Sequence, residues 1–183
     1  MEQIKITIAL IIAVLLQWTL RNVSESFMFV DFPLIIVVYA ALQGNSVKSL
    51  FYGTFAGIAV DALSYGLLGA NGFSKTLVAF VVSELVRRVY VENLLLRIPV
   101  IAGASLLDDM VYYGMHRLLG QEPTAQFVTT IAYTLIGTTI AGTIIYLLLD
   151  SFFAENIRKG RRERFTQRRQ TRRRNPIRLG SRR

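Results

Sequence analysis

Three side-chain types that hydrolases use lie in the fifth apolar stretch of the chain. Ser105, Asp109 and His116 fall on one broad face of a helix, together with Tyr112 and Tyr113. A serine nucleophile and a histidine base must approach within roughly 3 Å of each other. Ser105 and His116 are about 16 Å apart along a single helix, so no dyad forms within it. His116 is also the only histidine, and we therefore expect no catalytic residues and no enzymatic activity.

Asp61 places a carboxylate inside a long apolar run, FYGTFAGIAVDALSYGLLGANGF, over residues 51–73. At about 100° per residue, Gly53, Gly57, Asp61 and Ser64 share one stripe of a helix. Small residues at this spacing let helix backbones approach closely in lipid. An Asp at a lipid-facing helix centre costs about 2.5–3.5 kcal/mol, so we expect Asp61 to point toward neighbouring helices.

Three interpretations of Asp61 are compatible with the sequence. In the first, Asp61 lies near the outer end of its helix, is hydrated or hydrogen-bonded to the glycine-containing turn that follows, and has an architectural role. In the second, it is a buried polar contact that sets helix register or receives a partner. A proton or ion site is the third. The turn itself, with Gly66, Gly69 and Gly72, is not a phosphate loop, because the Gly-Lys-Ser/Thr ending is absent.

Two adjacent acids, Asp108 and Asp109, form a second candidate for interactions. Neighbouring residues on a helix cannot point the same way, so we expect one to face the bundle and the other a wet groove or a partner. The candidates for interaction or helix packing are therefore Gly53, Gly57, Asp61, Ser64, Gly66, Gly69, Asp108 and Asp109.

Two further patterns predict structural contacts, with no chemistry assigned to them. Glu84 precedes Arg87 and Arg88 by three and four residues, which predicts local ion pairs at the membrane edge. A seam of small residues also runs along the last apolar stretch. Its members are Thr130, Thr134, Gly137, Thr138 and Ala141, and such seams pack helices together in lipid.

A membrane domain has to position all of these residues. Of the 183 residues, 52% are hydrophobic, and nearly all of these precede residue 157. At about 20 apolar residues per span, the sequence predicts six helices. They cover residues 4–20, 27–43, 49–68, 73–89, 98–118 and 127–149. Pro33 interrupts the second, which is a short span or a re-entrant segment. We predict an all-α membrane protein, a compact bundle of six transmembrane helices over residues 1–156.

Basic residues in the short loops predict the orientation of this bundle. Five of them fall on the side of the N-terminus: Lys5, Lys48, Arg87, Arg88 and Arg97. Three fall on the other side: Arg21, Lys75 and Arg117. The C-terminal segment carries thirteen more Lys and Arg, and an even number of spans places it beside the N-terminus. We expect a multi-pass protein with both termini in the cytoplasm.

Residues 157–183 have too little apolar content to build a core, and we expect a disordered basic cytoplasmic tail. Its arginines are candidates for contact with anionic lipid or with an acidic cytoplasmic protein, and they include Arg161, Arg162, Arg172, Arg173 and Arg174. Nucleic acid is not expected, because Phe165 is the only aromatic side chain available for base stacking. The chain has no cysteine, so disulfides and thiolate metal sites are excluded. No metal site and no cofactor is expected.

Residues 31–72 resemble the MreD family of rod shape-determining membrane proteins. The resemblance rests on DFPLIIVVYAAL, a short polar loop with a basic residue, and GTFAGIAVDALSYGLLGANG. In this family a helix with small residues leads to an Asp and then to a glycine-containing turn. Those places are taken here by Gly53, Gly57, Asp61, Gly66 and Gly69. Asp31 departs from the family pattern, because it precedes the proline rather than following it.

This resemblance implies a non-enzymatic scaffold of the bacterial inner membrane that belongs to the elongation machinery, or elongasome. Members of the family act with MreC and with the cytoplasmic MreB filament, and they support peptidoglycan synthesis and cell shape. The implied fold is similar to that of the substrate-binding subunits of energy-coupling vitamin transporters. An alternative function is therefore a membrane subunit of a small-molecule transporter, whereas the scaffold role requires no small-molecule substrate.

Overall fold

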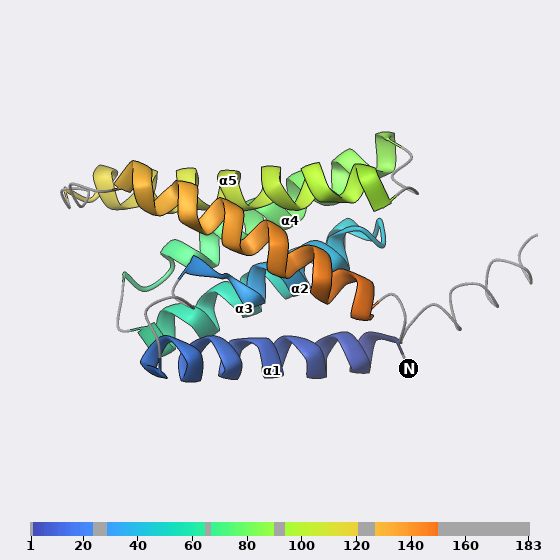
Figure 1. Cartoon of the computed structure of the whole chain (residues 1–183), viewed down its shortest axis with the longest axis horizontal. Helices are drawn as coiled ribbons and strands as arrows, with labels where there is room; N and C mark the ends of the chain where they lie inside the picture. The colour runs from blue at the N-terminus through green and yellow to red at the C-terminus, as the bar shows by residue number, and fades with distance from the viewer. Residues whose placement is uncertain (1, 24–28, 65–66, 90–93, 121–126, 150–183) are drawn as a thin grey trace, which may run out of the picture. The chain divides into compact units, whose positions relative to one another are not determined.

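The computed structural model describes residues 2–23, 29–64, 67–89, 94–120 and 127–149. Within these ranges the chain forms six helices and no strand, which confirms the all-helical prediction. The helices are α1 (Glu2–Val23), α2 (Phe32–Ala41), α3 (Ser46–Ser64), α4 (Ala70–Arg88), α5 (Leu94–Leu118) and the Phe127–Leu149 helix. The long helices lie roughly along a common direction (Figure 1).

Two of the described helices are long and apolar enough to cross a membrane. They are α1, over Gln3–Arg21, and the Phe127–Leu149 helix. Both expose large apolar side chains, and Ile8, Ile12, Ile136 and Ile140 are each more than half exposed. In the other described helices the length is too short, as in α2, or polar side chains interrupt the apolar sequence. Of the six helices in the described ranges, two therefore meet the criterion for a membrane span.

The second helix is shorter than the predicted range of 27–43. It covers Phe32–Ala41, and ten residues are about 15 Å long, half of the roughly 30 Å hydrocarbon layer. Pro33 in the first turn favours a helix start, and the Asp31 side chain caps it by accepting a hydrogen bond of 2.8 Å from the backbone N–H of Leu34. Gly44, with φ of +75°, lies in the turn that follows. These residues limit α2 to half a span.

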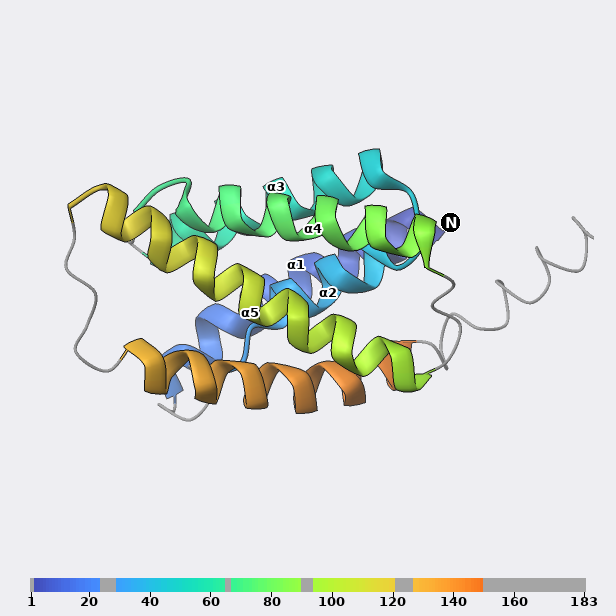
Figure 2. The same cartoon turned by 90° about the horizontal axis from the view of Figure 1, so that it is seen from above.

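The surroundings of α2 explain its uniformly apolar sequence. The helix lies between the other helices in both views (Figure 1, Figure 2). Every residue from Pro33 to Ala41 is buried. A helix that is apolar on all sides belongs in a core, where no face meets water. The centre of the bundle is thus filled by a half-length helix.

Glycines bring α3 and α4 together at backbone distance. A Cβ at Gly53 would lie 2.6 Å from the carbonyl oxygen of Lys75, and one at Gly57 would collide with the carbonyl oxygen of Asn71. Helix α3 is described as far as Ser64, short of the predicted end at residue 68, and a turn at Leu68 and Gly69 leads into α4. Gly69 makes that turn with φ of +99°, and α4 starts at Ala70, three residues before the predicted position.

The small residues of the Phe127–Leu149 helix also meet neighbouring segments. A Cβ at Gly137 would lie 2.8 Å from the carbonyl oxygen of Phe29, and Thr138 is fully buried. Thr134, by contrast, donates to the carbonyl of Thr130 in its own helix. The predicted seam therefore packs at Gly137 and Thr138.

The predicted ion pairs at the end of α4 are confirmed. Glu84 accepts from Arg87 at 3.2 Å and from Arg88 at 3.1 Å. Both arginine side chains are exposed, so these pairs add little to the free energy of unfolding.

The contact between α3 and α4 predicts a strong effect of one added methyl group. Gly57→Ala should reduce the free energy of unfolding by about 1–3 kcal/mol or more, because the new Cβ collides with backbone that cannot rotate away. Gly103→Ala is the matched control, since a Cβ at Gly103 in α5 would meet nothing within 4 Å. Thermal unfolding of the purified proteins in detergent measures both. Equal melting temperatures for the two variants would contradict this close packing.

Candidate functional site

The first turn of α2 is held by side chains from other helices. The backbone N–H of Phe32 donates to Gln17 Oε1 of α1 at 3.0 Å, and that of Asp31 donates to Thr138 Oγ1 at 3.2 Å. The backbone N–H of Leu34 donates to the Asp31 side chain. N–H groups at a helix start lack partners within the helix, and in lipid no water replaces them. The start of α2 is therefore a polar centre inside an apolar bundle.

Lys75 of α4 occupies the middle of this centre. Its side chain is 0% exposed, and Nζ lies 2.5 Å from Asp31 Oδ2 and 2.9 Å from Asp108 Oδ2. Nζ also donates to Asn71 Oδ1 at 3.4 Å. One ammonium group thus joins a carboxylate before α2 to a carboxylate of α5, with both partners within direct hydrogen-bonding distance.

Asp108 is the link to α5, and both of its carboxylate oxygens are used. Oδ2 accepts from Lys75, and Oδ1 accepts from the hydroxyl of Ser74 in α4. The Ser74 hydroxyl lies 3.0 Å from the backbone carbonyl of Asp108 as well. Ser74 is fully buried and Asp108 is 4% exposed. Two neighbouring residues of α4 therefore bind a single acid of α5.

Asp61 likewise connects two helices, α3 and α4, through hydrogen bonds to its carboxylate. It is 2% exposed, and it accepts backbone hydrogen bonds from Gly69 at 2.8 Å, Gly72 at 3.1 Å and Asn71 at 3.2 Å. The side-chain amide of Asn71 donates to it at 2.8 Å. Gly69, the residue that precedes α4, has no side chain for capping. A carboxylate from α3 caps α4 in its place, where the helix dipole favours negative charge.

Asn71 joins these two groups into a single network. Its side-chain nitrogen donates to Asp61, and its side-chain oxygen accepts from Lys75. We call Asp31, Asp61, Asn71, Ser74, Lys75 and Asp108 the ion network. It connects the start of α2 with α3, α4 and α5. Buried ions are costly to desolvate, and pairing with further hydrogen bonds is what compensates for that cost.

The predicted site residues are distributed over this arrangement as follows. Gly53 and Gly57 pack against α4, whereas Ser64 is half-buried and donates to the Val60 carbonyl of its own helix at 2.6 Å. Asp109 is half-buried, and its Oδ2 has no hydrogen-bond partner among the described residues. Gly66 and the tail arginines Arg161, Arg162, Arg172, Arg173 and Arg174 lie outside the described residues.

Of the three interpretations of Asp61, hydrogen bonding to the glycine-containing turn agrees with the geometry. Its burial places the carboxylate away from solvent. A partner contact at Asp61 stays a prediction, because its oxygens are occupied by the turn in the isolated chain.

Counting Lys75 among the basic residues of a short outer loop was wrong, although the predicted helix 73–89 included it. Lys75 lies within α4, buried together with Val78, Ala79 and Val82 on one face. The spacing of 75, 78, 79 and 82 is the helical signal that identifies this inward face. Sequence reasoning also missed Asn71 and Ser74, and it assigned no role to Asp31. No local pattern reveals which distant acids reach a buried lysine.

Catalytic geometry is not assembled by the residues of the fifth helix. His116 Nδ1 lies 2.9 Å from the backbone carbonyl of Tyr112 in its own helix. Ser105 is buried, and its hydroxyl has no hydrogen-bond partner in the described part of the chain. Within the same ranges, no three His, Asp or Glu side chains are placed to hold a metal ion.

An all-helical protein with paired charges inside and apolar side chains outside has the organisation of an integral membrane protein. The family described as rod shape-determining protein MreD matches residues 2–155, and the chain belongs to this MreD family. Its members are bacterial membrane proteins that take part in determining rod shape. No curated protein and no solved structure matches the chain.

Removal of the ammonium group should be the most damaging single change in the ion network. Lys75→Met leaves Asp31 and Asp108 buried without a cation, and the expected loss in free energy of unfolding is about 3–5 kcal/mol. Lys48→Met, at an exposed lysine of α3, should change it by less than about 0.5 kcal/mol. Denaturant unfolding in detergent gives both values.

A combined variant separates lost charge balance from lost packing. Asp31→Asn and Asp108→Asn together with Lys75→Met remove the unpaired charges, so most of the lost stability should return. A triple variant that unfolds as readily as Lys75→Met alone would show that charge pairing does not explain the effect.

Proposed function

We propose that the protein is a non-enzymatic integral membrane scaffold of the rod-shape, or elongation, complex. In this role it links MreC and the cytoplasmic MreB filament to peptidoglycan synthesis and so maintains cell shape. Membership of the MreD family over residues 2–155 is the observation that carries the proposal. The absence of an assembled catalytic pair at Ser105 and His116 supports a role in binding rather than in chemistry.

The use of polar groups in the described helices supports a scaffold role. Lys75 binds Asp31 and Asp108, and Asp61 accepts hydrogen bonds from the start of α4, so these groups fix the relative positions of α2, α3, α4 and α5. The outward faces carry apolar side chains instead, for example Ile4, Ile11 and Leu15 of α1, which are 65%, 54% and 52% exposed. A rigid interior with long apolar outer faces suits the lateral binding of another membrane helix.

The proposal includes six membrane spans with both termini in the cytoplasm. The start of α1, the start of α3 and the end of α4 lie at one end of the described helices, whereas the ends of α1, α3 and α5 lie at the other (Figure 1, Figure 2). Lys75 is buried, so it no longer counts as a loop residue. Of the three basic residues counted on the side opposite the N-terminus, Arg21 and Arg117 remain. The positive-inside asymmetry is therefore larger than the sequence count gave.

The same proposal assigns the basic segment 157–183 to the inner membrane surface. Its thirteen Lys and Arg residues would bind anionic lipid or an acidic cytoplasmic protein. Each of them near the membrane surface would contribute up to about 1 kcal/mol.

In this proposal, the implied similarity to the substrate-binding subunits of vitamin transporters is a similarity of fold and not of function. Substrate transport would require space at the centre, and α2 fills the centre of the described helices.

Depletion of the protein in its host tests the proposed function. Cells should lose constant rod width and become rounded over a few generations, because side-wall synthesis loses its membrane organiser. Microscopy of cell width and of fluorescent MreC localisation measures the effect. Unchanged width together with unchanged MreC localisation would remove the scaffold role, and a co-purifying vitamin or ATPase would indicate transport.

Asp61→Leu should leave membrane insertion intact but weaken assembly with partners. The substitution removes the acceptor for four hydrogen bonds at the start of α4, and each unsatisfied buried donor costs about 1–3 kcal/mol. MreC recovered by co-purification should fall severalfold. Glu84→Leu is the matched control, since the ion pairs of Glu84 within the described ranges are with the exposed Arg87 and Arg88. Normal MreC recovery with Asp61→Leu would count against a role for this contact in assembly.

A further inference from the structure

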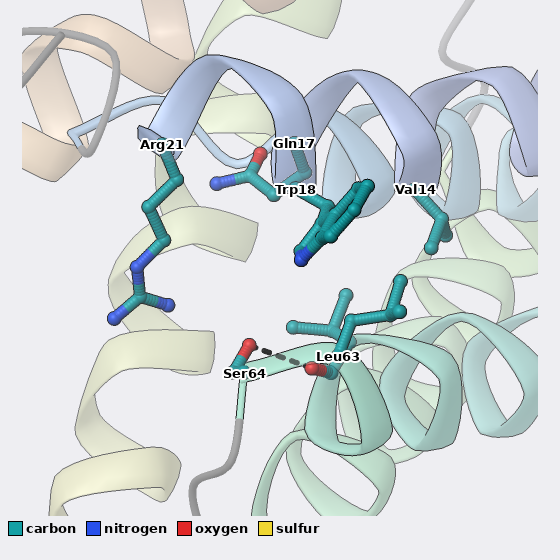
Figure 3. A pocket seen from close by; sticks show the side chains of 7 residues that line it. Val14, Gln17, Trp18, Arg21, Leu63 and Ser64 are labelled. Carbon is teal, nitrogen blue, oxygen red and sulfur yellow. Dashed lines mark hydrogen bonds between the residues drawn. The ribbon is translucent and has the colours of Figure 1, made fainter. Parts of the chain in front are cut away.

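A pocket of about 330 Å³ lies between the end of α1 and the end of α3 (Figure 3). One side is lined by Gln17, Trp18 and Arg21 in the last two turns of α1, and Ser64 lies across from them. The apolar part of the lining comes from Val14, Val60 and Leu63. The volume is at the lower end of the range for small-molecule sites. It matches a headgroup rather than a whole lipid.

The polar groups of α1 in this pocket are nitrogen donors. Arg21 carries five N–H groups and Trp18 carries one, and neither side chain can accept a hydrogen bond. The side-chain oxygen of Gln17 already accepts from the backbone N–H of Phe32 at 3.0 Å. This contact fixes the amide so that its NH₂ group is left for the pocket, on the side of Arg21 (Figure 3). Three different residues therefore offer donors to the same space.

No carboxylate among the described residues accepts a hydrogen bond from these donors. None of the described residues that line the pocket is acidic, and Arg21 forms no salt bridge in the described part of the chain. The Ser64 hydroxyl donates to the Val60 carbonyl (Figure 3). A cation in the last turn of α1 suits the helix dipole. The dipole does not account for the orientation of Gln17 or for the apolar wall.

We propose that this pocket binds the phosphate-bearing headgroup of an anionic phospholipid. A planar guanidinium with additional N–H donors is a recurring phosphate site. The lipid source follows from the surroundings, because α1 is long and apolar enough to span the membrane and Trp18 near its end is 48% exposed. Trp and Arg at a span end lie at the level of the headgroups. Val14, Val60 and Leu63 then receive the start of an acyl chain.

This site uses residues other than those of the basic segment 157–183, and it lies at the C-terminal end of α1. It does not rest on the scaffold function, since lipid binding is measured on the purified protein without any partner. A lipid held at Arg21 would connect α1 to α3 at an end where the ion network does not reach α1.

Trp18 makes a direct test possible, because it is the only tryptophan in the chain. The full chain is placed in phosphatidylcholine nanodiscs that contain a fraction of phosphatidylglycerol with brominated acyl chains, which quench nearby tryptophan. Brominated phosphatidylcholine at the same fraction is the reference lipid. Phosphatidylglycerol should be preferred at Trp18 roughly fivefold or more, as expected for one cation engaged with a charged headgroup. Equal quenching by the two brominated lipids would overturn the proposal.

Arginine variants and a phosphate competitor show whether the preference for phosphatidylglycerol arises at the pocket and whether the bound ligand is a lipid. Arg21→Gln should abolish it, Arg21→Lys should keep part of it, and Arg117→Gln should leave it unchanged, since Arg117 is exposed on α5 and outside the pocket. Inorganic phosphate at matched ionic strength should not relieve the quenching. An undiminished preference in Arg21→Gln would exclude the pocket, and loss of the preference in inorganic phosphate would show that the site takes free phosphate in place of the lipid headgroup. Thermal unfolding of each variant confirms that it is folded.

Discussion

The contact of the Lys75 ammonium group with Asp31 and Asp108 is the interaction on which the described structure depends. It follows from the presence of a half-length helix in the centre of the bundle. Because α2 begins inside the bundle, its first N–H groups and its capping carboxylate need partners there. The Lys75 ammonium group balances the charge of the Asp31 carboxylate that caps α2. Gln17 and Thr138 accept hydrogen bonds from the backbone N–H groups of Phe32 and Asp31. The apolar sequence of α2 supplies the burial, and the polar groups around its start determine its position.

Helices α3 and α4 provide the platform that presents Lys75 to its two acids. Gly53 and Gly57 remove the side chains that would separate the two backbones, and Asp61 closes the turn between them. Hydrophobic burial does little to distinguish one helix pairing from another in lipid, so close packing and hydrogen bonds supply that selectivity. The small-residue stripe and the acids that interrupt it therefore have the same purpose, which is to fix one arrangement of helices. Such a fixed arrangement agrees with the proposed scaffold role.

The number of helices and the inward direction of Gly53, Gly57 and Asp61 were predictable from the sequence, since apolar length and helical spacing are local properties. The family followed from the pattern around Asp61 as well. The extent of α2 was not predicted, although Asp31 and Pro33 are a recognisable start signal. Lys75 was misplaced because a basic residue near a predicted helix end looks like a loop residue. Its partners, Asp31 and Asp108, are 44 and 33 residues away along the chain, and only the tertiary arrangement brings them together.

Chemical labelling of lysine amines in the unmodified protein tests the central claim most directly. The full chain in nanodiscs is acetylated for a series of times, and the modified fraction at each lysine is quantified by mass spectrometry, with unfolded protein as the reference for intrinsic reactivity. The amine of Lys48 is exposed and should react quickly, whereas that of Lys75 should remain unmodified until the protein unfolds, because it is buried and bound by two carboxylates. Reaction of Lys75 at the rate of Lys48 in the folded protein would contradict the account.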